Sequence, residues 1–173
     1  MRTIILASLL LVSIPWPAVA QTTATPRQFT SKACGFQIKL PADWRIKPSL
    51  SKKCAFTVIA PHRADGDLDL LVQNGNLEQG SGDLGFTKEG ERWTLQGEDS
   101  VEAVQIESPT WTGLQGTVAT RIYENGFYRG LGDQTRALLF DRKNRIAEVT
   151  CYVGEKVVAE FVKGFEFLDK PQP

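Results

Sequence analysis

Residues 125–140, NGFYRGLGDQTRALLF, hold a dense group of side chains that could do chemistry. Gly130, Gly132 and Asp133 lie between two arginines, a composition that can serve a phosphate-binding loop. Such a loop needs a following helix, because the helix N-terminus supplies the aligned N–H groups that hold the phosphate. QTRALLF (134–140) has the composition of a strand, so the sequence favours glycines at a strand bend or bulge.

Aromatic residues and arginines surround these glycines. Tyrosine and arginine are among the residues that most often anchor protein–protein interfaces. The candidate partner-binding residues are therefore Arg121, Tyr123, Phe127, Tyr128, Arg129 and Arg136. The alternative interpretation is a solvated sheet face with ordinary aromatic cross-strand pairs.

Three cysteines, Cys34, Cys54 and Cys151, offer thiol chemistry. Cys34 and Cys54 each precede a segment with strand periodicity, whereas Cys151 lies on the apolar face of RIAEVTCYV (145–153). In an oxidising compartment one pair is expected to form a disulfide. We expect a Cys34–Cys54 bond, with Cys151 reduced and packed as a small hydrophobic residue. A bond from Cys151 to one of the other two is the alternative.

Catalytic and metal-binding motifs are weak in this chain. His62 is the one histidine and lies in the turn-like segment APHRADGD, where a solvated side chain is the favoured interpretation. Asp65, Asp67 and Asp69 alternate as the first ligands of a calcium loop do, but Leu70 stands where that loop requires glycine. No HExxH, GxSxG or Walker motif occurs. The sequence therefore predicts a protein without an enzyme activity, a metal site or a cofactor.

The N-terminus, MRTIILASLLLVSIPWPAVA, has the layout of a secretory signal peptide over residues 1–20. Arg2 precedes an apolar run from Ile4 to Ile14, and Ala18-Val19-Ala20 has the pattern of a cleavage site. A membrane anchor is the alternative, but a spanning helix needs about 20 apolar residues, and prolines interrupt this run. We therefore expect cleavage near Ala20 and a periplasmic or secreted protein with no integral membrane segment after cleavage.

The net charge and the chain length narrow the possible binding partners and the number of domains. The 173-residue chain carries 20 basic and 20 acidic residues, so no long-range field favours nucleic acid or an anionic membrane. Residues 21–33 are polar and are expected to form a disordered lead-in. Residues 34–169 are expected to form a single domain that is large enough to bury its own core.

Alternating apolar and polar residues predict a series of strands separated by turn residues. The expected strands are 35–40, 44–46, 54–60, 68–74, 92–97, 101–107, 112–124, 127–131, 134–141 and 145–153. Asn125-Gly126 predicts a hairpin, because both central residues of a type I′ turn need positive φ.

Two segments break the strand pattern. Residues 74–92 contain five glycines without apolar periodicity, which indicates a functional or mobile loop. A short helical turn within this segment is the alternative. EKVVAEFVKGFEFL (155–168) has apolar residues at helical spacing. The expected fold class is α+β, an antiparallel β-sheet or sandwich arranged as a meander with a C-terminal helix packed on it.

This order of elements resembles the PsbP-like superfamily, as a small bacterial exported member. The resemblance is carried by the opening GFQIKLPADW (35–44), by the strands up to RIAEVTCYV (145–153), and by the closing helix that ends in GFEFL (164–168). It implies a sandwich of sheet and helices and mostly binding roles, and it transfers no catalytic residue. The glycine-rich residues 74–92 and the cysteines depart from the family pattern.

These observations together favour an exported, non-enzymatic domain that binds another envelope or secreted macromolecule, as an inhibitor, immunity protein or accessory factor does. A protein partner fits, and nucleic acid does not. The alternative is a small-ligand carrier or envelope enzyme with a pocket near residues 74–92. A purely structural envelope component is a third class.

Overall fold

The computed structural model describes residues 25–60, 67–152 and 154–169. The expected signal peptide, His62 and Asp65 lie outside these ranges. Within them, antiparallel strands dominate and two helices occur, one of them near the C-terminus. The expected α+β class is confirmed at this level.

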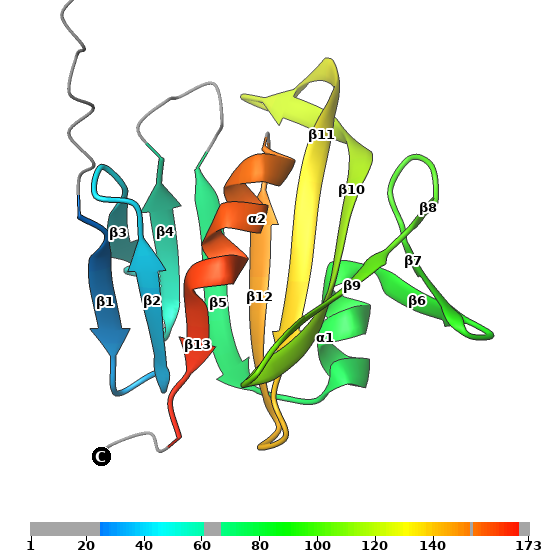
Figure 1. The fold of residues 1–173 in the computed structure, drawn as a ribbon. Helices are drawn as coiled ribbons and strands as arrows, with labels where there is room; N and C mark the ends of the chain where they lie inside the picture. The colour runs from blue at the N-terminus through cyan, green and yellow to red at the C-terminus, as the bar shows by residue number, and fades with distance from the viewer. Residues whose placement is uncertain (1–24, 61–66, 153, 170–173) are drawn as a thin grey trace, which may run out of the picture.

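A seven-stranded antiparallel sheet forms the centre of the molecule (Figure 1). Its order is β3 (Arg45–Pro48), β4 (Ala55–Ile59), β5 (Leu68–Asn74), β12 (Arg145–Cys151), β11 (Phe127–Phe140), β10 (Trp111–Glu124) and β9 (Val104–Ser108). The order is not a plain meander, because the chain leaves the sheet after β5 and returns at the opposite edge. β12 then fills the position between β5 and β11.

One face of this sheet is covered by a small sheet and a helix. The small sheet contains β1 (Arg27–Ser31), β2 (Phe36–Leu40) and β13 (Phe165–Phe167), and the helix is α2 (Glu155–Gly164). Phe36, Phe161 and Phe165 are almost fully buried in the core between these layers. This core forms because α2 carries its apolar residues on one side, as helical spacing predicts.

Strand β1 corrects the expectation of a disordered lead-in at residues 21–33. Arg27–Ser31 pairs with β2 along its whole length. Phe29 packs its ring against Phe36 and Phe56, with ring centroids 6.0 and 5.7 Å apart. Two aromatic contacts and a complete strand pairing order a segment whose composition is otherwise polar.

The opposite face carries helix α1 (Leu77–Leu84) and an outer sheet of β6 (Phe86–Glu89), β7 (Arg92–Leu95) and β8 (Val101–Glu102). The expected loop at 74–92 contains the helix α1, in line with the helical turn considered there, and also the strand β6, which the sequence did not predict. A Cβ atom at Gly80 would lie 2.6 Å from Leu138 Cδ1, so glycine lets α1 approach the sheet. Asn76 caps the start of α1 by accepting the Gln79 N–H at 2.9 Å.

The disulfide joins Cys34 and Cys54, as expected, and Cys151 is buried outside this bond. The bond ties the turn between β1 and β2 to the start of β4. Cys151 lies in the same core as Val149, which agrees with its predicted place on the apolar face of β12.

Replacing both Cys34 and Cys54 by Ser is expected to lower the free energy of unfolding by roughly 2–3 kcal/mol, because the bond closes a loop with a sequence separation of 20. Urea unfolding of the variant and the wild type, both without reductant, measures the difference. Reduced wild-type protein is the control and should match the variant. Equal stability of variant and oxidised wild type would contradict this role of the bond.

Candidate functional site: the end of the β10–β11 hairpin

Strands β10 and β11 are 14 residues long and pair with each other along nearly their whole length. Their outer neighbours stop early, since β9 pairs only as far as Gln115 and β12 only as far as Thr135. The end of the hairpin therefore projects from the sheet, and it bends over at the top of Figure 1. A bond from the Glu98 N–H to the Ala119 carbonyl at 2.9 Å anchors the base of this end.

The turn and a bulge set the direction of this end. Asn125 and Gly126 both have positive φ, 53° and 81°, as the predicted type I′ turn requires. The pairing shifts between Ile122, opposite Gly130, and Tyr123, opposite Tyr128, which leaves an extra residue on β11. Gly130 has a φ of 140°, a conformation that glycine adopts without strain. The prediction of a glycine at a bulge is confirmed, and β11 runs on through Gly132 as one strand.

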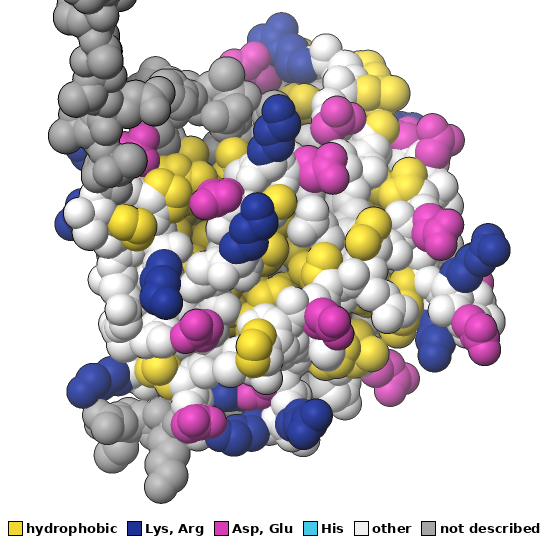
Figure 2. Space-filling model, viewed as in Figure 1, with side chains coloured by type: hydrophobic (Ala, Val, Ile, Leu, Met, Phe, Trp, Pro, Cys, Tyr) yellow, Lys and Arg dark blue, Asp and Glu magenta, His cyan; other side chains and the backbone are white. Residues whose placement is uncertain are grey.

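Five apolar side chains are exposed at this end, and we call them the tip patch: Ile122, Tyr123, Phe127, Tyr128 and Leu131. The exposed fraction reaches 71% for Phe127. Tyr123 and Tyr128 hold each other across the strands, with ring centroids 5.9 Å apart in an edge arrangement. In Figure 2, hydrophobic side chains gather at the top of the molecule, over the end of the hairpin.

The charged residues beside the tip patch are paired with each other. Arg121 Nε lies 3.1 Å from Glu98, and the hydrogen bond and charge of Glu98 raise the pKa of Arg121. Arg129 Nε lies 2.9 Å from Glu124. Because both arginines already have carboxylate partners, the surface presented by the tip patch is mainly aromatic.

Arg136 is separate from the other five predicted partner-binding residues. Its side chain donates hydrogen bonds to Gln134 at 2.7 Å and to the backbone carbonyls of Leu84 and Gln96 at 2.8 and 3.2 Å. Partial burial lowers its pKa. Arg136 therefore holds the end of α1 and the segment after β7 to the sheet, apart from the other five predicted residues.

The sequence prediction missed Ile122 and Leu131 as members of the exposed cluster. Ile122 shares its strand face with Leu114 and Val118 in the sequence pattern, and alternation does not show where the neighbouring strands end. The available signal was the run 127–140, in which the two expected strands 127–131 and 134–141 are separated by only Gly132 and Asp133.

A cavity lies beside α1, near residues 74–92, the segment in which the alternative function places a ligand pocket. It has a volume of about 460 Å³ and is lined by Leu77, Trp93, Ile106, Leu114 and Phe140, among others. Leu77 comes from residues 74–92, and Trp93 follows directly. Its walls are mainly apolar, and no group of three or more His, Cys, Asp or Glu among the described residues is arranged to hold a metal ion.

No helix in the described ranges is long and apolar enough to cross a membrane.

No family model matches the sequence, and no curated protein matches it. A crystal structure from Bacteroides thetaiotaomicron VPI-5482 is similar over 86% of this chain, with a TM-score of 0.53 and 16% identity. The chain spans half the length of that protein. The solution structure of the cyanobacterial PsbP (CyanoP) from Synechocystis sp. PCC 6803 matches 88% of this chain and 98% of its own, with a TM-score of 0.51 and 9% identity. The chain thus has a weak resemblance to PsbP at the level of the fold.

Proposed function

We propose that this protein is an exported, non-enzymatic binding domain that recognises another envelope or secreted protein through the tip patch. The observation that carries the proposal is the exposure of three aromatic rings, Tyr123, Phe127 and Tyr128, on a hairpin that projects from the sheet. Contiguous exposed apolar surface on a globular protein commonly marks an interaction site.

The tip patch has the chemistry of an interface anchor. Aromatic rings bury a large area on binding and lose little conformational freedom, and they dominate the energetics of many interfaces. Arg121 and Arg129 are paired with Glu98 and Glu124, so the patch offers little free positive charge for nucleic acid. A protein surface with an apolar recess fits these features better.

The disulfide fits an exported protein best. Disulfides persist in oxidising compartments, and the Cys34–Cys54 bond lies at the edge of the core, where both side chains are partly buried. The apolar leader pattern of residues 1–20 gives the same indication. The partner is therefore proposed to be another periplasmic or secreted protein.

Replacing Phe127 and Tyr128 together by Ala is expected to weaken partner binding by at least about tenfold, because each substitution removes an exposed aromatic ring that would anchor the interface. Affinity capture from a periplasmic extract identifies the partner, and calorimetry with the purified partner measures the affinity. Tyr152→Ala is the matched control, since Tyr152 is an exposed tyrosine outside the tip patch, at 53%. Specific capture that is unchanged in the double variant would remove the tip patch from consideration.

The cavity beside α1 favours a second function, that of a small-ligand carrier. Its volume of about 460 Å³ lies in the range of ordinary ligand pockets. Its partly buried Trp93 would report occupation through a change in indole fluorescence. Binding of an apolar ligand there, with Phe127→Ala/Tyr128→Ala behaving as wild type, would support the carrier function over the interface.

A further inference from the structure

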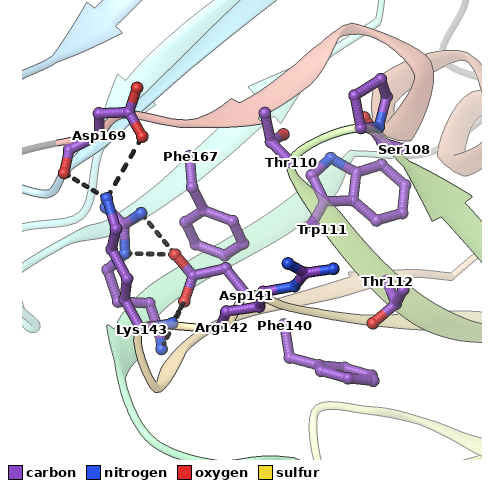
Figure 3. Close-up of a pocket in the computed structure, with 12 residues that line it drawn as sticks. Ser108, Thr110, Trp111, Thr112, Phe140, Asp141, Arg142, Lys143, Phe167 and Asp169 are labelled. Carbon is purple, nitrogen blue, oxygen red and sulfur yellow. Dashed lines mark hydrogen bonds and ion pairs between the residues drawn. The ribbon is translucent and has the colours of Figure 1, made fainter.

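A second cavity lies at the other end of β10 and β11, far along both strands from the tip patch. It has a volume of about 520 Å³, and we call it the basal pocket. Trp111, Phe140 and Phe167 provide its aromatic lining, and Arg142 and Lys143 lie at its rim (Figure 3). Trp111 is the first residue of β10 and Phe140 the last of β11, so the pocket opens where the two strands begin and end.

The aromatic walls of the basal pocket are fixed in place. Trp111 is 5% exposed, and its indole Nε1–H donates to the Phe165 carbonyl at 2.8 Å. Phe167 is buried beneath the Arg145 guanidinium, which lies 4.9 Å from the ring centroid. The walls are therefore preformed, and little conformational entropy is lost in ordering them when a ligand binds.

Two of the three cations around the pocket are already paired. Arg145 donates to the Asp141 carboxylate, with a 2.8 Å bond from Nε. Lys143 Nζ lies 3.3 Å from the Asp169 carboxylate. The pocket lining therefore has three cations against two carboxylates, which leaves one positive charge.

Arg142 carries the unmatched charge. It is exposed and has no hydrogen-bond or ion-pair partner among the described residues. In Figure 3 its guanidinium extends toward Trp111 and Thr112, away from the paired groups at Asp141. The hydroxyls of Thr110 and Thr112, also in the pocket lining, offer further hydrogen-bond donors and acceptors.

We propose that the basal pocket binds a small carboxylate with a flat apolar body, such as an aromatic acid. The planar guanidinium of Arg142 matches a carboxylate in a bidentate fashion. The rings of Trp111 and Phe140 provide surface for the flat body, since aromatic groups pack favourably in edge or offset arrangements. A cationic ligand is disfavoured by the excess positive charge. This site is independent of the tip patch and of the protein partner proposed for it.

The probe pair 2-naphthoate and 2-naphthamide tests the proposal, because the two differ in charge and hardly in shape. Calorimetry measures both affinities, and the indole N–H resonance of Trp111 in two-dimensional NMR reports on binding at this pocket. Wild-type protein is expected to bind 2-naphthoate about two- to fivefold more tightly than 2-naphthamide, as one charge-assisted contact at a surface site provides.

Arg142→Gln is expected to lower the affinity for 2-naphthoate to that for 2-naphthamide. The affinity for 2-naphthamide should stay unchanged. Arg27→Gln is the matched control, an exposed arginine on β1 outside the pocket, and should bind as wild type does. Melting curves of both variants check that they fold. Equal binding of acid and amide, no effect of Arg142→Gln, no shift of the Trp111 resonance, or no saturable binding of 2-naphthoate at its solubility limit would each overturn the proposal.

Discussion

Asp141→Ala is expected to lower the free energy of unfolding by about 3–5 kcal/mol, because it leaves the buried Arg145 charge without its partner. The two side chains are only 5% and 8% exposed. Asp141 also accepts the backbone N–H groups of Lys143 and Arg145 at 2.9 and 3.0 Å, so the β11–β12 turn loses its cap as well. Urea unfolding followed by circular dichroism measures the loss.

A companion variant separates the cost of an unpaired charge from the value of the pair. Arg145→Met alone is expected to lower the free energy of unfolding by a similar amount, since Asp141 then remains buried as an unpaired carboxylate. Asp141→Leu/Arg145→Met is expected to recover most of the loss, because apolar replacement of a whole buried pair is often neutral. Additive losses in the double variant would show that the pair itself, and not the uncompensated charge, carries the stability.

Gly164→Ala is expected to lower the free energy of unfolding by about 3–4 kcal/mol, at the upper end of overpacking effects. A Cβ atom at Gly164 would lie 2.1 Å from the Lys39 carbonyl oxygen, and backbone cannot move aside as a flexible side chain can. The end of α2 would have to withdraw from β2 and would loosen the packing of the buried Phe161. Thermal and urea unfolding measure the effect.

Gly82→Ala is the matched control for this variant. Gly82 also lies in a helix, α1, but a Cβ atom there would have no heavy atom within 4 Å. Alanine is expected to leave stability unchanged or to raise it by about 0.5–1 kcal/mol, since it restricts the unfolded chain. Equal losses at Gly164 and Gly82 would contradict the close approach of α2 to β2.

Local patterns predicted the parts of the fold that depend on neighbouring residues. Asn125-Gly126 identified the hairpin through the φ values that its turn requires. The spacing of Val157, Val158 and Phe161 identified α2, whose buried side is the predicted one. The position of Cys34 and Cys54 before two strand patterns led to the bond that the structure contains.

Features that depend on distant contacts were missed. Residues 74–92 looked like a loop because their glycines replace the apolar side chains that mark a helix, yet Gly80 is what allows α1 to reach Leu138. Arg136 looked like an interface residue because its backbone acceptors, the carbonyls of Leu84 and Gln96, come from elsewhere in the chain. The basal pocket joins the turn after β11 to the C-terminal β13, and no local pattern predicts that meeting.

The pairing of β2 with β13 determines when this protein can complete its fold. Gln37 donates to Glu166 across a separation of 129 positions. Strand β2 therefore cannot pair with β13 until the C-terminal part of the domain is present. A chain that emerges N-terminus first, from a ribosome or a translocation channel, cannot close its main core until β13 has emerged. Such non-local closure slows folding, and it leaves the apolar residues of β2 without their final neighbours until β13 arrives.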